Sequence, residues 1–287
     1  MPIVEARELS HVYSKGTPFE KIAIDHVNLC IDDGECVGLI GHTGSGKSTL
    51  IQHFNALLKP TEGTVLLQGQ DIFASKAAGR DSRKIVGLVF QYPEYQLFGE
   101  TVYEDIAFGP RNQKLSEDTV DRRVRDASVF TGVEEDWFAR SPLELSGGQK
   151  RRVAIAGVLA MEPRLLILDE PAAGLDPEGR ESILRGLLDW KRSHDATLLL
   201  VTHDMSAAAT FCDRLLVMTE GRLMADDTPA EIFAHSEKLR AAGLDLPPCA
   251  SLADRLRENG LPLPNGLFTI DALTEALLAL KKDGASC

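Results

Sequence analysis

Residues 36–48 read Cys-Val-Gly-Leu-Ile-Gly-His-Thr-Gly-Ser-Gly-Lys-Ser, and this stretch decides the fold. Its first part, residues 36–40, is an uninterrupted apolar run that predicts a buried strand. Its second part, residues 41–48, fits the pattern G-x-x-x-x-G-K-S, and residues 48–58 have helical character. A glycine-rich loop between a strand and a helix lets backbone N–H groups and the helix N-terminus surround phosphate oxygens. The sequence therefore predicts an α/β domain that binds a nucleotide.

The residues of this loop have separate roles in the pattern. Lys47 reaches the β- and γ-phosphates, and the hydroxyl of Ser48 is a ligand for Mg²⁺. A purely structural glycine-rich turn is the alternative, and it is disfavoured once a strand precedes the loop and a helix follows it. The chain is therefore predicted to bind ATP and Mg²⁺ with residues of this region. They are Gly41, His42, Thr43, Gly44, Ser45, Gly46, Lys47, Ser48 and Thr49.

The composition is that of an acidic globular protein. Of the 287 residues, 44% are hydrophobic and 26% are charged, and the formal net charge is -12. Because binding to nucleic acid by phosphate contacts needs a basic face, we expect no nucleic acid partner. The five cysteines are dispersed and indicate neither a disulfide framework nor a zinc site. No apolar run reaches the ~18 residues of a spanning helix, so we expect a chain that is neither secreted nor integral to a membrane.

Apolar patterning divides the chain into a main domain and a C-terminal extension. Residues 5–13 and 23–31 alternate in character and predict antiparallel strands, and the buried strands 165–168 and 197–201 imply a mostly parallel sheet. A largely helical insert, about residues 92–160, precedes the second buried strand. The sequence pattern changes near Asp226. After this residue, Thr228 to Glu231 fit the capping-box pattern of a helix start. The final helix carries an apolar stripe made of Ile270, Leu273, Leu277 and Leu280.

Residues 165–170 read Leu-Leu-Ile-Leu-Asp-Glu, an apolar strand that ends in two carboxylates. Such a strand can deliver an acid to Mg²⁺ and a second acid to the attacking water. We assign Asp169 to the metal and Glu170 to the water. Strands also end in acids simply because they reach solvent, but a phosphate-binding loop in the same chain favours the catalytic interpretation.

Residues 145–149 read Leu-Ser-Gly-Gly-Gln and precede the basic residues Lys150, Arg151 and Arg152. A small, flexible turn at a basic helix start is a second anion-binding helix N-terminus. Here the sequence resembles the ABC ATPase family, whose signature reads LSGGQ. The resemblance implies that each ATP lies between the phosphate-binding loop of one protomer and the signature of the other. The signature residues that it implies are Ser146, Gly147, Gly148 and Gln149.

The resemblance covers about residues 3–225 and implies roles for further positions. Tyr13 would stack on adenine, Gln91 would reach the metal and the γ-phosphate, Asp176 would lie in the loop that crosses the dimer interface, and His203 would contact the γ-phosphate. Taken singly, these are a core tyrosine, an unremarkable glutamine, a helix-capping aspartate and a structural histidine. The implied catalytic set is Lys47, Gln91, Glu170 and His203, and the implied metal set is Ser48, Gln91 and Asp169.

Several stretches resemble a narrower group, the ATPases of energy-coupling-factor (ECF) importers, which take up vitamins and transition-metal ions in prokaryotes. They are residues 16–20, 41–44, 93–98, 105–110 and 151–160. Within the group, Gly-Thr-Pro-Phe-Glu at 16–20 and Glu-Tyr-Gln-Leu-Phe at 94–98 resemble the second, A2-type subunit. A departure is Ala172-Ala173, where Thr-Ala is common. The alternatives are the ATPase of another importer class and a soluble ABC ATPase that does not act in transport.

The resemblance implies a fold and a set of partners. The fold is an ABC-type P-loop domain, residues 1–226, with a mixed sheet, an antiparallel β subdomain and a helical subdomain, followed by a helical extension, residues 227–287. The partners are a second ATPase in a homodimer or heterodimer, a transmembrane coupling subunit with basic coupling helices, and a substrate-binding membrane subunit. The chain would be peripheral, at the cytoplasmic face of the cell membrane.

Two surfaces are expected to contact these partners. Residues 92–98 combine apolar and acidic side chains directly after Gln91, and we expect them to form a docking groove in which Glu94 and Glu100 face a basic helix. The alternative is local packing of the insert. The extension is expected to hold two ATPase subunits together without nucleotide, and its alternative is packing against its own core.

Overall fold

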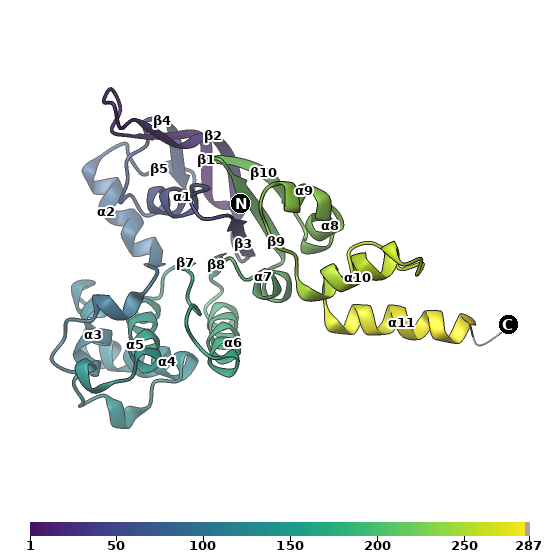
Figure 1. Cartoon of the computed structure of the whole chain (residues 1–287). Coiled ribbons are helices and arrows are strands. Elements are labelled where there is room, and N and C mark those ends of the chain that lie inside the picture. The colour runs from purple at the N-terminus through teal and green to yellow at the C-terminus, as the bar shows by residue number, and fades with distance from the viewer. Residues whose placement is uncertain (285–287) are drawn as a thin grey trace.

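The loop that decides the fold lies at the end of a strand in the middle of a six-stranded sheet (Figure 1). The computed structural model describes residues 1–284. The strands of this sheet pair in parallel except for the edge pair β9 and β10, which is antiparallel. In spatial order they are β10 (Arg222–Asp227), β9 (Arg214–Thr219), β3 (Cys36–Gly41), β8 (Thr197–Val201), β7 (Leu165–Asp169) and β6 (Val86–Val89).

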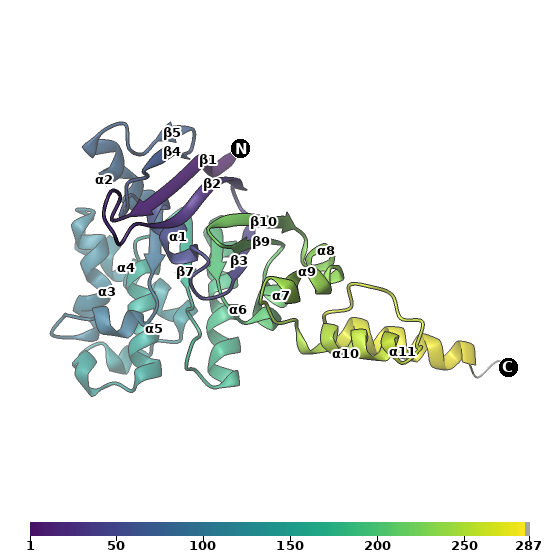
Figure 2. The same ribbon diagram turned by 45° about the horizontal axis from the view of Figure 1, so that its top comes forward.

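The three central strands are buried along their whole length, which explains their uninterrupted apolar sequences. Helices on both sides of the sheet exclude water from them (Figures 1 and 2). The predicted strands at 36–40, 165–168 and 197–201 are therefore confirmed. The predicted helix at 48–58 is shorter, because α1 (Lys47–Phe54) ends where Asn55 takes a non-helical conformation.

A second, antiparallel sheet packs beside the first and covers α1. Its strands, in spatial order, are β2 (Lys21–Asp32), β1 (Pro2–Tyr13), β4 (Glu62–Leu67) and β5 (Gln70–Asp71). The predicted strands 5–13 and 23–31 are confirmed, and both begin earlier than expected. One apolar cluster joins the two sheets and contains Leu9, Leu39 and Phe54, all fully buried. This cluster fixes the end of β1 near the start of α1.

A group of helices lies apart from the antiparallel sheet and is reached from the end of β6 (Figure 1). It contains the 3₁₀ turns η1 (Pro93–Gln96), η2 (Glu135–Trp137) and η3 (Pro142–Glu144) and the helices α3 (Val102–Asn112), α4 (Glu117–Thr131) and α5 (Gly147–Leu159). Before it comes α2 (Lys76–Ile85), and after it come α6 (Pro177–Ser193) and α7 (Met205–Phe211). The helical insert at 92–160 remains our proposal for a subdomain, supported by the mutual packing of α3, α4 and α5.

The C-terminal extension leaves the edge of the main sheet. It consists of α8 (Pro229–Ala234), α9 (Ser236–Ala241), α10 (Pro248–Glu258) and α11 (Ile270–Gly284), and α10 and α11 project together from the body (Figures 1 and 2). The side chain of Thr228 accepts a hydrogen bond from the backbone N–H of Glu231, but the predicted capping box is only half formed, because the N–H of Thr228 donates to Oδ1 of Asp227. Among the described residues, no helix combines the length and apolar character needed to cross a bilayer.

The apolar stripe of α11 packs mainly within the extension. Leu273 is buried in a small cluster with Ala253 and Leu263, and Leu277 and Leu280 are partly buried against it. Ile270 does not join this cluster, because its side chain is 73% exposed. The extension therefore has a minor core of its own, separate from the two large clusters of the ATPase body.

Candidate nucleotide-binding and catalytic site

The phosphate-binding loop has a backbone that only glycine tolerates at its key position. Gly46 has φ +104°, and a Cβ on it would lie 2.5 Å from the carbonyl oxygen of Ala23. Gly46 is also the N-cap of α1, and no side chain caps the helix there. The first N–H groups of α1 are thus left for an external acceptor, and the helix dipole favours an anion at this place. The predicted binding residue Ser45 is completely buried and is not among the residues that line the cleft, and its Oγ has no hydrogen-bond partner among the described residues.

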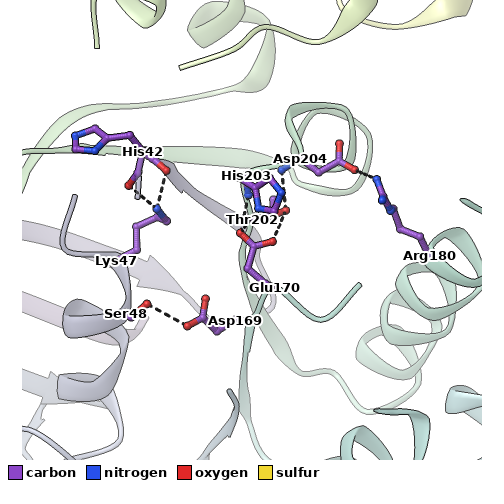
Figure 3. Close-up of polar contacts among 10 residues, drawn as sticks. His42, Lys47, Ser48, Asp169, Glu170, Arg180, Thr202, His203 and Asp204 are labelled. Atoms are coloured by element: carbon purple, nitrogen blue, oxygen red, sulfur yellow. Dashed lines mark hydrogen bonds and ion pairs between the residues drawn. The ribbon is translucent and has the colours of Figure 1, made fainter. Parts of the chain in front are cut away.

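Lys47 folds back over the loop. Its Nζ donates hydrogen bonds to the carbonyl oxygens of Gly41 at 2.6 Å and His42 at 3.0 Å (Figure 3). Burial lowers the pKa of Lys47, and the charges of Glu170 and Asp169 partly oppose this shift. The ammonium group is therefore held beside the loop in a poorly hydrated place, where it can bind phosphate oxygens strongly.

Ser48 and Asp169 are the pair that fits a magnesium ion. The hydroxyl of Ser48 donates to Oδ2 of Asp169 at 3.2 Å, across 121 residues of sequence (Figure 3). Burial raises the pKa of Asp169, and the hydrogen bond from Ser48 partly opposes this shift. Mg²⁺ usually takes one or two carboxylates together with substrate phosphates, so one hydroxyl and one carboxylate beside the phosphate-binding loop fit this ion. The assignment of Gln91 to the metal remains a proposal.

Glu170 and His203 meet because β7 and β8 are neighbours and pair Asp169 with Val201. Nδ1 of His203 lies 2.7 Å from Oε1 of Glu170, and the backbone N–H of His203 donates to the same oxygen at 2.9 Å (Figure 3). The backbone of Glu170 is in the left-handed region, with φ +52°, and its N–H donates to the carbonyl of Val201. These contacts hold the carboxylate in one orientation. A carboxylate that aligns a water molecule needs such a fixed orientation.

One open cleft of about 430 Å³ gathers most of the predicted site residues. This volume suits a ligand the size of a nucleotide. The predicted residues that line it are Tyr13, Gly41, Thr43, Gly44, Gly46, Lys47, Ser48, Thr49, Gln91, Asp169, Glu170 and His203. His42 contributes its backbone carbonyl to Lys47, and its imidazole turns toward the carbonyl of Thr43.

Tyr13 lines the same cleft as the carboxylates of Asp169 and Glu170. Its side chain is 39% exposed, its hydroxyl lies 3.2 Å from Oγ1 of Thr49, and its ring makes an edge contact with the ring of His11. An exposed, braced aromatic ring can stack on a base, whereas a core tyrosine would be covered. Lys21 and Ala23 also line the cleft, and sequence reasoning missed both. Their place depends on the pairing of β1 with β2, which puts Lys21 opposite Tyr13.

The signature is not part of this cleft. Ser146 is the N-cap of α5, and it forms a reciprocal capping box with Gln149, whose side chain accepts from the N–H of Ser146 at 2.9 Å. Ser146 and Gly147 are exposed. The single subunit therefore leaves both residues outside its own phosphate-binding cleft. Asp176, also exposed, accepts from the N–H of Gly179 and caps α6.

The basic start of α5 differs from the expectation that its cations bind an anion. Arg151 is buried and forms an ion pair with Glu94. Arg152 donates to the carbonyl oxygen of Thr131 at 2.7 Å. Two of the three cations are thus used within the subunit, and the anion-binding potential of α5 rests on its N–H groups.

Comparison with known proteins agrees with this geometry. The ABC transporter family matches residues 24–173. An energy-coupling factor transporter ATP-binding protein EcfA2 of Symbiobacterium thermophilum is 53% identical over 277 residues, which are 96% of either chain. The protein of the same name from Caldanaerobacter subterraneus subsp. tengcongensis is 49% identical over 278 residues, 97% of either chain.

Solved structures show the same architecture. CbiO1 of Clostridium perfringens, described as part of the ABC transporter complex CbiONQ, has a TM-score of 0.75 and 42% identity over 88% of this chain and 99% of its own. A dimeric ATP-binding cassette in a post-hydrolysis state, bound to ADP and Pi, has a TM-score of 0.71 and 30% identity over 78% of this chain and 98% of its own. The chain therefore belongs to the ABC transporter family, and within it to the ATP-binding subunits of energy-coupling factor transporters.

Proposed function

We propose that this subunit binds and hydrolyses ATP to power an ECF importer of vitamins or transition-metal ions. The observation that carries the proposal is the single cleft that holds the Lys47 ammonium, the Ser48–Asp169 pair and the Glu170–His203 pair. These groups are what phosphoryl transfer to water requires: charge neutralisation, a metal position and a water-orienting carboxylate. A protein that only binds ATP does not need a water-orienting carboxylate.

Binding uses the two ends of the cleft. The ring of Tyr13 stacks on the adenine, and Lys47 with the N–H groups of α1 holds the β- and γ-phosphates. Ser48 and Asp169 would hold Mg²⁺, which would supply positive charge to the phosphates. Gln91, at the end of β6, faces the same cleft and senses the γ-phosphate end of the nucleotide.

Hydrolysis uses the carboxylate at the end of β7. Glu170 accepts a hydrogen bond from the attacking water and orients its lone pair toward the γ-phosphorus, while His203 fixes the carboxylate and contacts the γ-phosphate. The new P–O bond forms to the water oxygen as the bond to the β-phosphate oxygen breaks, and a proton of the water passes to the carboxylate of Glu170, which then releases it to solvent. The products are ADP and inorganic phosphate.

The complete site needs a second ATPase subunit, either identical or paralogous. Ser146, Gly147 and Gly148 lie outside the cleft of their own chain, and the N–H groups of Gly147 and Gly148 have no hydrogen-bond acceptor among the described residues. We place them against the γ-phosphate bound by the partner subunit, with Gln149 as their cap and Asp176 at the interface. The dimeric assembly of a related cassette with 30% identity supports this arrangement.

The membrane subunit docks on the aromatic surface that follows Gln91. Tyr92, Tyr95, Phe98 and Phe108 are all exposed, and the rings of Phe98 and Phe108 are in edge contact. Such a cluster of exposed aromatic side chains is typical of a protein interface. The subunit would then act as a peripheral protein at the cytoplasmic face of the membrane, where a separate membrane subunit binds the transported substrate.

Two details of the expected groove are wrong. Glu94 does not face outward, because its carboxylate is paired with the buried Arg151. Leu97 is partly buried against the main apolar cluster and contributes to packing. The acid available to a basic coupling helix is therefore Glu100, which is exposed.

The test is capture of the membrane subunits. A Tyr95→Asp/Phe98→Asp variant should lose co-purification from membranes by at least about tenfold, since aromatic anchors at interfaces usually contribute more than 1 kcal/mol each. The matched control is Phe19→Asp, which changes an equally exposed aromatic residue between β1 and β2. Thermal melting of both variants checks that the fold is intact. If the double variant captures the membrane subunits and supports uptake as well as the parent does, the proposed docking surface is wrong. The ATPase assignment would not be affected.

A further inference from the structure

Glu94 and Arg151 form the most enclosed ion pair of the helical subdomain among the described residues. Nη2 of Arg151 lies 2.8 Å from Oε1 of Glu94, and Nε lies 3.1 Å from Oε2. The two side chains are only 5% and 15% exposed. This two-bond arrangement matches the planar fork of arginine to the carboxylate and fixes both the distance and the orientation.

The segment that contains Glu94 is held at its other end as well. Oδ1 of Asp105, in the first turn of α3, accepts hydrogen bonds from the N–H groups of Phe98 and Gly99 at 3.0 Å each. Pro93, directly before Glu94, is buried, whereas Tyr95 is 84% exposed. Because α3 itself packs on α5, residues 92–99 are attached to the signature helix both directly and through α3.

Burying two charges is costly, and an apolar pair of the same size would hold a helix and a turn together at least as well. What the ion pair adds is a defined relative position of the two elements. Arg151 lies four residues after Gly147, about one helical turn or 6 Å from the exposed N-terminus of α5. A shift of Arg151 relative to η1 therefore also moves the start of α5, where the signature lies.

We propose that Arg151 is a positioning residue, which acts through Glu94 to fix the signature of a subunit to the Gln91 segment of the same subunit. The inference rests on the proposed dimer, in which Gln91 serves the cleft of its own chain and the signature serves the cleft of the partner. Gln91 stands three residues before Glu94. The ion pair thus links the two composite ATP sites, so that a movement of Gln91 at one site repositions Ser146 and Gly148 at the other.

The experiment uses full-length, assembled ATPase dimers without the membrane subunit. The double variant Glu94→Gln/Arg151→Gln removes both charges and leaves no uncompensated ion in the core. Affinity for an ATP analogue, measured on single subunits, should stay within about twofold, because neither residue lines the cleft. The kcat of the dimer should fall at least about tenfold, since small misplacements of catalytic groups carry costs of this order. The matched control is Asp136→Asn/Arg140→Gln, which removes an exposed pair of the same subdomain and should change neither quantity.

A distance measurement separates positioning from general loss of activity. Spin labels on Tyr95→Cys and Leu143→Cys, both at exposed positions, should give a narrow distance distribution in the parent, on a background without reactive native cysteines. The distribution should broaden in the double variant and stay narrow in the control. If the double variant fails to fold, Arg151→Lys carries the same test, because it keeps the charge and loses the fork.

An unchanged distance distribution overturns the proposal, and so does a kcat within about twofold of the parent. A change in kcat that small is no larger than the variation expected for sites that do not interact, so it would show no coupling through this ion pair. Failure of the proposed function has a different appearance: the parent dimer and the Asp136→Asn/Arg140→Gln control would then both lack ATPase activity. The spin-label result does not depend on hydrolysis or on docking to a membrane subunit. It therefore decides the positioning role in either case.

Discussion

The imidazole of His203 and the carboxylate of Glu170 are held together by two contacts to one oxygen atom, Oε1, at 2.7 Å from Nδ1 and 2.9 Å from the backbone N–H. The carboxylate is 12% exposed and the imidazole is 75% exposed. The carboxylate is therefore fixed in a sheltered place, while the face of the imidazole stays open to a ligand. This asymmetry supports our proposal that Glu170 orients the water and that His203 contacts the γ-phosphate.

Replacing Glu170 by Gln should separate binding from hydrolysis. The amide keeps the shape of the side chain and can still accept from the N–H of His203, but it polarises the attacking water poorly. We expect kcat to fall at least about a hundredfold, or about 2.7 kcal/mol in the barrier, with ATP affinity retained. Light scattering should show an ATP-trapped dimer. Glu134→Gln, an exposed substitution in the helical subdomain, is the control, and a Glu170→Gln rate within a few-fold of wild type would refute the assignment.

Replacing Lys47 by Ala should weaken the binding of nucleotide itself. The ammonium is already held at the loop by the carbonyls of Gly41 and His42, so it contributes to the ground state as well as to the transition state. The Kd for an ATP analogue should rise at least about tenfold, because a charge-assisted bond to phosphate in a sheltered site contributes more than 1 kcal/mol. Calorimetry measures it, with Lys15→Ala, outside the cleft, as the control. Equal affinities for all three proteins would contradict the phosphate-binding role.

The candidate catalytic residues at the strand ends can be predicted from the sequence, because each is recognised from the residues directly around it. The loop 41–48, the acids at the end of β7 and the histidine two residues after β8 all follow buried apolar runs, so a parallel sheet must bring them to one edge. Lys21 could not be found in this way, because its place depends on the register of two antiparallel strands.

The Glu94–Arg151 pair shows a second limit of the sequence. Its partners are 57 residues apart, and each has a more obvious local interpretation: Glu94 as an acid in a surface groove, Arg151 as part of a basic helix start. Only the packing of η1 on α5 reveals that the two charges neutralise each other. A charged residue next to an apolar segment can be exposed to solvent or buried in an ion pair, and the amino-acid composition does not distinguish the two cases.

His53 makes the stability of the fold depend on pH. It is completely buried in α1, its Nδ1 lies 2.7 Å from the carbonyl oxygen of Thr49, and its Nε2 lies 3.1 Å from Nδ1 of His11. Burial lowers the pKa of His53 to about 4. The unfolded chain therefore takes up a proton on this residue first as the pH falls from about 6.5, and stability is lost between this pH and about 4.

The size of this effect is measurable. At pH 5 the shift corresponds to about 2 kcal/mol of lost unfolding free energy relative to neutral pH. A His53→Gln variant is less stable at pH 7.5, but it should lose about 2 kcal/mol less than wild type between pH 7.5 and pH 5 in urea titrations. Identical pH dependences for the two proteins would show that His53 does not titrate as the buried geometry requires.

The projecting hairpin of α10 and α11 bears on how two ATPase subunits stay together without nucleotide. Three of its apolar side chains remain exposed after the minor core has formed: Leu252 at 48%, Ile270 at 73% and Leu278 at 53%. Deleting residues 250–287 would test the hairpin crudely, because Ala250 is buried in the main apolar cluster and its loss would disturb the ATPase body. Substitutions on the exposed side of α11 avoid that problem.

We expect the variant Ile270→Asp/Leu278→Asp to weaken the nucleotide-free dimer without unfolding the hairpin. Neither side chain belongs to the minor core around Leu273, so the charges would remain in water in a monomer and would be buried only at an interface. Burying an unpaired carboxylate costs several kcal/mol, which should move the assembly mass in light scattering from dimer to monomer at micromolar concentration. Thr274→Asp, on the same helix but replacing a polar exposed residue, should have a smaller effect. A nucleotide-free dimer that persists in the Ile270→Asp/Leu278→Asp variant would mean that these two exposed side chains of α11 do not form the subunit contact, and that another surface holds the nucleotide-free dimer together.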